Sequence, residues 1–81
     1  MRILVTGAAT GIGRATAIEL TKRGHEVVAT ARRVDALNDL DVADRLQLDV
    51  TDEASVTRAI AAAGDLDGIV NNAGLSEPGP I

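Results

Sequence analysis

The chain has 81 residues, a formal net charge of −4, and no Phe, Trp, Tyr or Cys. This length lies below the roughly 100–150 residues of a typical domain, and the core must form without aromatic side chains or disulfides, so we expect part of a larger protein. The acidic balance excludes a nonspecific nucleic-acid binder, and no apolar run approaches the roughly 18 residues that would span a membrane.

The first half of the chain predicts a strand, a helix and a second strand. Met1–Val5 is a nearly continuous apolar run, typical of a strand buried on both faces of a sheet. Residues 12–23 have the composition of a helix, and Gly24 is a natural stop at its C-terminus. Val27–Ala31 is a second, β-branched run. The apolar positions of the helix are Ile12, Ala15, Ile18 and Leu20.

The second half repeats this alternation. Residues 34–40 predict a short helix and residues 46–50 a third strand, which Asp44-Arg45 precedes and Thr51-Asp52 follows. Thr51 or Asp52 is expected to cap the next helix, which ends at Gly64, and residues 68–71 predict a fourth strand. Strands that alternate with helices indicate a parallel sheet with right-handed crossovers. The apolar stripe of the last helix is Val56, Ala59, Ile60 and Ala63.

A glycine-rich turn, Thr6-Gly7-Ala8-Ala9-Thr10-Gly11-Ile12-Gly13, joins the first strand to the first helix. A diphosphate bound there needs a tight turn, close approach of the backbone and free N–H groups at a helix N-terminus. We expect Gly7 to permit the turn, Gly11 to leave room for phosphate and Gly13 to let the helix pack on the strand. The alternative is a plain turn between strand and helix. A Walker-type loop is excluded because no Lys-Ser or Lys-Thr follows the glycines.

This glycine spacing, with Asp49-Val50 at the end of the third strand and Asn71-Asn72-Ala73-Gly74 after the fourth, resembles the classical short-chain dehydrogenases/reductases. The resemblance covers essentially the whole chain but only about the first third of a typical family member. It implies a partial Rossmann-type fold of the α/β class, a doubly wound parallel sheet with four strands in the order 3-2-1-4. Residues 1–81 are then the N-terminal, dinucleotide-binding part of one domain, without its catalytic and substrate-binding part.

The resemblance also implies a nicotinamide dinucleotide site. Asp49 would accept a hydrogen bond from the adenine amino group, with Val50 beside the ring, whereas the alternative for Asp49 is a residue that merely caps the next helix. Four residues would line the cleft toward the nicotinamide-side ribose: Asn71, Asn72, Ala73 and Gly74. Their alternative is a turn held by side-chain hydrogen bonds. Five residues would surround the diphosphate and the adenosine ribose: Gly7, Thr10, Gly11, Ile12 and Gly13.

Arg32 and Arg33 close the second strand. An NAD site typically has an acidic residue at this point to bind the ribose hydroxyls, whereas an Arg can hold a 2′-phosphate through two hydrogen bonds. Here Ala31 occupies the expected acidic position and Arg32 follows it. The pattern therefore favours NADP over NAD, and the alternative is an arginine pair that only solvates the end of the strand.

The catalytic residues of the family have no counterpart in the chain. The resemblance implies proton transfer by a Tyr with a Lys four residues later, but the chain has no Tyr and its only Lys is Lys22. We therefore expect no catalytic residue here, and a parent that transfers hydride between NADP(H) and a carbonyl or alcohol substrate. The alternative is a stand-alone dinucleotide-binding sensor or interaction module without turnover.

Location and partners follow from the same observations. The N-terminus lacks the apolar core of a signal peptide, so we expect a cytoplasmic protein with neither membrane nor nucleic-acid partners. With no Cys and one His, His25, no metal site is expected. The family resemblance implies that the parent is a homo-oligomer and that its ligands are the dinucleotide and a small-molecule substrate.

Overall fold

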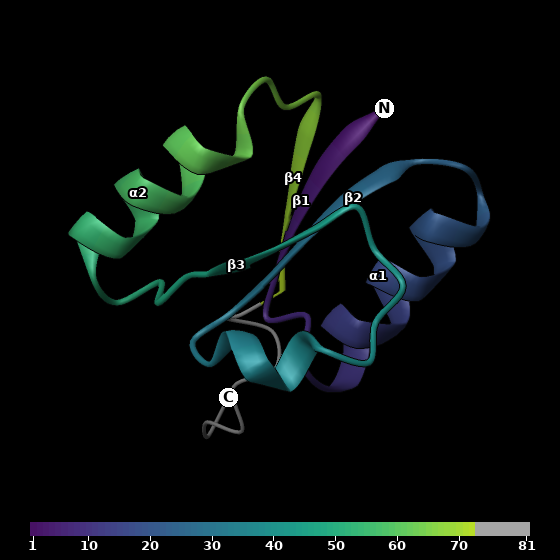
Figure 1. Cartoon of the computed structure of the whole chain (residues 1–81), viewed down its shortest axis with the longest axis horizontal. Coiled ribbons are helices and arrows are strands. Elements are labelled where there is room, and N and C mark those ends of the chain that lie inside the picture. The colour runs from purple at the N-terminus through teal and green to yellow at the C-terminus, as the bar shows by residue number, and fades with distance from the viewer. Residues whose placement is uncertain (73–81) are drawn as a thin grey trace.

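A parallel four-stranded sheet with a helix on each face forms the body of the molecule (Figure 1). The structure is a computed structural model and describes residues 1–72. All neighbouring strands are parallel and lie in the order β3-β2-β1-β4, which confirms the predicted topology. The elements are β1 (Arg2–Thr6), α1 (Gly11–Lys22), β2 (Glu26–Ala31), the 3₁₀ helix η1 (Val34–Leu37), β3 (Asp44–Gln47), α2 (Glu53–Ala63) and β4 (Gly68–Asn71).

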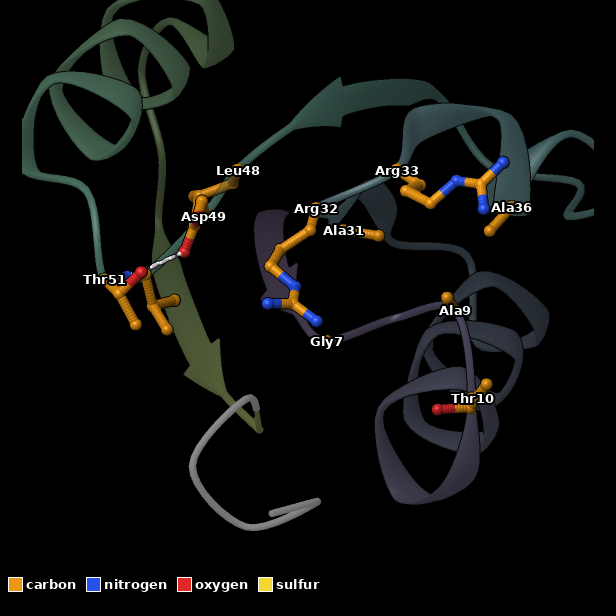
Figure 2. Close-up of a pocket in the computed structure, with 11 residues that line it drawn as sticks. Gly7, Ala9, Thr10, Ala31, Arg32, Arg33, Ala36, Leu48, Asp49 and Thr51 are labelled. Atoms are coloured by element: carbon orange, nitrogen blue, oxygen red, sulfur yellow. Dashed lines mark hydrogen bonds between the residues drawn. The ribbon is translucent and has the colours of Figure 1, made fainter.

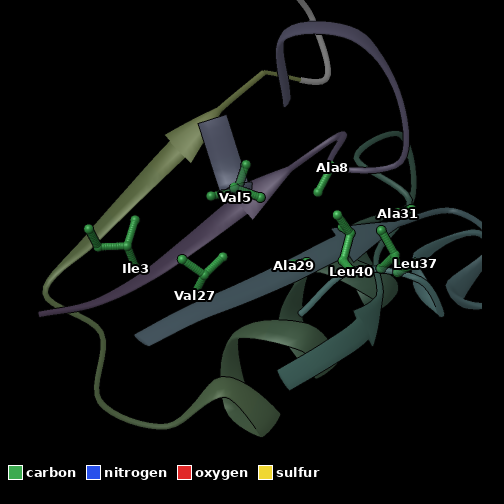
Figure 3. Packing of buried hydrophobic residues seen from close by; sticks show 9 residues of the cluster. Ile3, Val5, Ala8, Val27, Ala29, Ala31, Leu37 and Leu40 are labelled. Atoms are coloured by element: carbon green, nitrogen blue, oxygen red, sulfur yellow. The ribbon is translucent and has the colours of Figure 1, made fainter. Parts of the chain in front are cut away.

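β1 and β2 form the centre of the sheet and are buried on both faces. Because side chains alternate along a strand, Val5 points toward α1 whereas Leu4 points toward α2. Figure 3 shows the larger cluster, which fills the space between the sheet, α1 and η1. Its fully buried or nearly buried members are Ile3, Val5, Ala8, Ala17, Val27, Ala29, Ala31, Leu37 and Leu40.

The inward face of α1 differs from the expected one. Ile12 and Ile18 are 60% and 38% exposed, whereas the buried residues of the helix are Gly13 and Ala17. The helix lies so close to the β1–α1 turn that only small residues fit at the contact. The stripe that faces the sheet is therefore Gly13, Ala17 and the half-buried Leu20, rotated from the predicted one.

The segment after β2 is shorter and tighter than the predicted helix over residues 34–40. Only Val34–Leu37 is helical, and it is a single 3₁₀ turn. Leu37 and Leu40 are buried in the larger core cluster, so their side chains rather than helix propensity anchor the segment.

β3 begins and ends earlier than predicted. It pairs with β2 from Asp44, opposite Val28, to Gln47, opposite Ala31. β2 ends at Ala31, and the last backbone hydrogen bond between the two segments runs from the Leu48 N–H to the carbonyl of Ala31 at 2.8 Å. The predicted strand over residues 46–50 was therefore placed too late.

α2 follows a capped loop and crosses the face of the sheet opposite α1 (Figure 1). The side chain of Asp52, rather than that of Thr51, accepts from the first-turn N–H groups of Ala54 and Ser55. Ala59 and Ala63 are buried as predicted, whereas Ile60 is 38% exposed. Within residues 1–72, no helix has the length and apolar character needed to cross a bilayer.

Candidate functional site

A pocket of about 450 Å³ opens beyond the carboxyl ends of β1, β2 and β3 (Figure 2). Parallel sheets of this kind bind ligands at this edge, because the loops after neighbouring strands converge there. Three loops form its walls: the β1–α1 turn, the end of β2 with η1, and the β3–α2 loop. The lining residues are Gly7, Ala9, Thr10, Ala31, Arg32, Arg33, Ala36, Leu48, Asp49, Val50 and Thr51.

The β1–α1 turn has a backbone that requires glycine. Gly7 and Gly11 have φ angles of +62° and +60°, in the left-handed region that side chains disfavour. Gly13 is required for space, because a Cβ built on it would lie 2.0 Å from the carbonyl oxygen of Gly7. A hydrogen bond from the Ala8 N–H to the carbonyl of Thr30, 2.9 Å long, fixes the turn to β2.

The N-terminus of α1 is suited to an anion. Thr10 is the N-cap residue, with extended backbone, but its side chain makes no capping hydrogen bond. The first turn also contains no acidic residue. The first N–H groups of a helix point along its axis and carry a partial positive charge, so they are available here to a negatively charged ligand.

A hydrogen-bonded network shapes the β3–α2 loop around Asp49. The carboxylate oxygen Oδ1 of Asp49 accepts from the hydroxyl of Thr51 at 2.6 Å and from its N–H at 2.9 Å. The backbone N–H of Asp49 donates to the buried Ser55 Oγ at 2.9 Å. The Thr51 hydroxyl is the main cause that holds the pKa of Asp49 below its usual value, and Arg32 adds a smaller attraction. Since Asp52 is the cap of α2, Asp49 does not cap that helix.

We predict that Thr51→Val raises the pKa of Asp49 toward its ordinary value of 3.8, because the strongest donor to the carboxylate is removed. A carboxyl group whose pKa is lower in the folded than in the unfolded protein stabilises the fold at pH values above its unfolded pKa. This stabilisation is lost as the pH falls through the folded pKa. The variant should therefore lose less stability on acidification. Carboxyl-carbon NMR titration measures the pKa, Thr57→Val on α2 is the control, and an unchanged Asp49 pKa would contradict the assignment.

Arg32 and Arg33 both line the pocket, but their surroundings differ (Figure 2). Arg33 pairs with Asp35 at 3.2 Å on the exposed surface. Arg32 forms no ion pair with any of residues 1–72, and it stands directly after Ala31, the last residue of β2. A free guanidinium group thus lies where the pocket meets the end of β2.

The residues at the end of β4 are tied to β1 instead of lining this pocket. Thr6 Oγ1 donates to Asn71 Oδ1 at 2.9 Å and accepts from the N–H of Asn72 at 2.9 Å. Asn72 is 3% exposed, and its Nδ2 has no partner within the described residues. Ala73 and Gly74, also predicted to be site residues, lie outside the described residues.

A model of the short chain dehydrogenase family matches residues 1–81. The chain belongs to this family. It is 40% identical over 83 residues to serine 3-dehydrogenase of Agrobacterium fabrum, covering 91% of this chain and 33% of that protein. It is 38% identical over 85 residues to the NADP-dependent 3-hydroxy acid dehydrogenase YdfG of Shigella flexneri, and this match covers 94% of this chain and 34% of that protein. The chain thus spans about a third of the length of these curated relatives.

Solved structures of the short-chain dehydrogenase family share the fold. A 3-ketoacyl-(acyl-carrier-protein) reductase from Brucella melitensis, crystallised with NADH, matches with a TM-score of 0.77 and 30% identity over 95% of this chain and 39% of that one. A putative short chain dehydrogenase/reductase family oxidoreductase from Aeromonas hydrophila matches with a TM-score of 0.78 and 34% identity. This match covers 86% of this chain and 38% of that one. These matches and the strand order confirm the predicted Rossmann-type fold.

The structure brings only some of the predicted site residues of this family member into the pocket. Gly11, Ile12 and Gly13 shape the adjoining turn and helix, while Asn71 and Asn72 lie beside β1. Sequence reasoning missed Ala9, Ala36, Leu48 and Thr51 as lining residues, since small or apolar side chains in loops carry no chemical signature. Of these four, only Thr51 had a recognisable sequence signal, because a hydroxyl residue two positions after an acidic residue can donate a hydrogen bond to its carboxylate. The predicted residues within the lining are Gly7, Thr10, Arg32, Arg33, Asp49 and Val50, and Ala31, which occupies the expected acidic position, lines it as well.

Proposed function

We propose that this chain is the cofactor-binding part of an NADP(H)-dependent oxidoreductase that interconverts a carbonyl and an alcohol. The observation that carries the proposal is the convergence of the α1 N-terminus, Arg32 and Asp49 on one pocket at the carboxyl edge of the sheet. NADP(H) has a chemical group that suits each of these three features. Its diphosphate suits the α1 N-terminus, its phosphorylated ribose suits Arg32, and its adenine amino group suits Asp49.

The charges and donors of the pocket fit such a cofactor. The uncapped first turn of α1 offers N–H donors to a diphosphate, and Gly7 gives the turn the backbone that this approach requires. The guanidinium of Arg32, which forms no ion pair among residues 1–72, is suited to a 2′-phosphate. The ionised carboxylate of Asp49 is suited to accept from an amino group, with Val50 next to it along the loop.

The nicotinamide ring would supply the hydride chemistry, and the residues of this chain would bind and orient the adenosine half. Orientation of the ring falls to the end of β4, where we propose that Asn71, Asn72, Ala73 and Gly74 border the cleft. The names of the relatives support a nicotinamide cofactor, because YdfG is called NADP-dependent and the Brucella melitensis reductase was crystallised with NADH.

We also propose the kind of protein to which this chain belongs. The family membership supports an enzyme rather than a stand-alone sensor module. We propose that the catalytic and substrate-binding groups belong to a longer, cytoplasmic and homo-oligomeric parent, and we expect the 81 residues alone to turn over no carbonyl or alcohol.

We predict that Arg32→Asp shifts the preference from NADPH toward NADH by about 1–3 kcal/mol, the scale of a hydrogen bond to a charged group. The new carboxylate would repel a 2′-phosphate and would accept from the free ribose hydroxyls of NADH. Calorimetric titration of both cofactors into both proteins measures the shift. Arg58→Asp, on the exposed surface of α2, makes the same charge change outside the pocket and should leave the preference unchanged. Tighter binding of NADH than of NADPH by the unmodified chain would contradict the proposed cofactor.

A further inference from the structure

A bidentate ion pair joins two segments that are 25 residues apart. Arg14 Nη2 lies 2.6 Å from Asp39 Oδ2, and Arg14 Nη1 lies 3.2 Å from Asp39 Oδ1. Arg14 belongs to the first turn of α1, and Asp39 follows η1. Two parallel hydrogen bonds between a guanidinium and a carboxylate fix orientation as well as distance, unlike a single surface contact.

Each partner is connected to a wall of the pocket through the backbone. The N–H of Arg14 donates to the carbonyl of Thr10, a pocket residue, at 3.3 Å. On the other side, Asp39 lies between two residues whose N–H groups bond back to η1: Asn38 donates to the carbonyl of Asp35 at 3.3 Å, and Leu40 donates to that of Leu37 at 3.0 Å. The same segment begins at the pocket, where the Ala36 N–H donates to the carbonyl of Arg33 at 3.1 Å. Figure 2 shows Arg33 and Ala36 on the η1 side of the pocket, and Ala9 and Thr10 on the α1 side.

Arg45 and two buried leucines also hold the η1 wall. Arg45 of β3 donates through Nε to the carbonyl of Leu37 at 3.0 Å, and through Nη2 to the carbonyl of Leu40. Arg45 therefore fixes η1 to the sheet, whereas the Arg14–Asp39 pair fixes it to α1. A single 3₁₀ turn has little stability of its own, so its position depends on these anchors and on the burial of Leu37 and Leu40.

Charge also favours this pairing. A cation in the first turn of a helix opposes the helix dipole, and Asp39 neutralises Arg14 there. The hydrogen bond to Arg14 holds the pKa of Asp39 below its ordinary value, so the carboxylate stays ionised at neutral pH.

We propose that Arg14 and Asp39 act as a clasp that sets the gap between the η1 wall and the α1 wall of the pocket, and that both are positioning residues for the cofactor. This inference rests on the proposed function. Neither residue lines the pocket, so the clasp acts through Thr10 on one side and through Arg33 and Ala36 on the other.

Removal of the Asp39 carboxylate distinguishes a positioning role from a purely electrostatic effect of its charge on the cofactor. Asp39→Asn removes a negative charge, so electrostatics alone would tighten the binding of an anionic cofactor. If the clasp positions the wall, Asp39→Asn instead weakens NADPH binding by about twofold to fivefold, the scale of a well-aligned exposed ion pair. Glu19→Gln is the control for charge, since it removes an equal charge and an exposed single-contact ion pair within α1, Arg23 Nε to Glu19 Oε2 at 2.9 Å, away from the pocket.

Calorimetric titration of NADPH into the 81-residue chain and its variants provides the test, with circular dichroism to verify equal folding. We expect weaker binding for Asp39→Asn, unchanged binding for Glu19→Gln, and recovery of most of the affinity in Asp39→Glu, which keeps the carboxylate. Unchanged or tighter binding by Asp39→Asn, or no recovery in Asp39→Glu, would overturn the clasp. Failure of the unmodified chain to bind NADPH would instead overturn the proposed function.

Discussion

Gly13→Ala is expected to destabilise the fold by at least about 3 kcal/mol, at the upper end of the range for overpacked sites. The added Cβ would lie 2.0 Å from the carbonyl oxygen of Gly7 and 2.7 Å from its carbonyl carbon. Both atoms belong to backbone, so no side chain can rotate away and α1 must move off the sheet. That movement would open space around the buried Ala17.

The direction of this effect is informative because intrinsic propensity acts the other way. Alanine is favoured over glycine within a helix by about 1 kcal/mol, so any loss comes from the tertiary contact. Urea denaturation of both proteins measures the difference. Gly68→Ala in β4 is the control, since a Cβ there meets nothing within 4 Å. Equal stability of the two alanine variants would show that α1 does not pack on the turn as described.

Gly11→Val is expected to weaken NADPH binding on the order of 100-fold, equivalent to about 2.7 kcal/mol, while most of the helix content is retained. In the protein alone, a Cβ on Gly11 meets nothing within 4 Å. That open space adjoins the first turn of α1, where we propose that the diphosphate lies. A branched side chain would occupy it and keep the phosphate away from the N–H groups.

Backbone strain has to be separated from this steric effect, because Gly11 has a φ of +60°. Gly24 provides the control, since it has a φ of +88° at the other end of α1 and is likewise surrounded by open space. Gly24→Val should share the loss of stability but keep its affinity for NADPH. Calorimetric titration and circular dichroism of both variants make the comparison. Retained NADPH affinity in Gly11→Val would place the cofactor elsewhere.

The parallel sheet and the glycine turn were predictable because their signals are local, whereas the strand order 3-2-1-4 was implied by the family resemblance. An apolar run followed by Thr6-Gly7 marks the end of a buried strand, and alternation of strands and helices leaves few parallel topologies. The inward face of α1 was not predictable in this way. Periodicity ranks Ile12 and Ile18 above Gly13, but the contact between Gly13 and Gly7 decides which face turns inward.

Other differences arise from contacts between distant segments. The bounds of β3 depend on where its partner β2 ends, and nothing within residues 44–50 carries that information. The Arg14–Asp39 pair is similarly invisible, because each residue looks like ordinary surface until the fold brings them together. The presence of Asp49 at the site was predicted, whereas its orientation by Thr51 and Ser55 emerges only from the loop geometry.

We propose that the cofactor binds in the pocket between the glycine turn, Arg32 and Asp49. The most direct test is a titration of the ¹⁵N-labelled chain with NADPH, followed through the backbone amide signals. We expect the largest shifts at Gly7, Thr10, Arg32 and Asp49, and little change at Thr16, Glu19 and Arg23, which line a second hollow on the outer face of α1 beyond its first turn. Shifts concentrated in that second hollow, or no shifts at millimolar NADPH, would contradict the account.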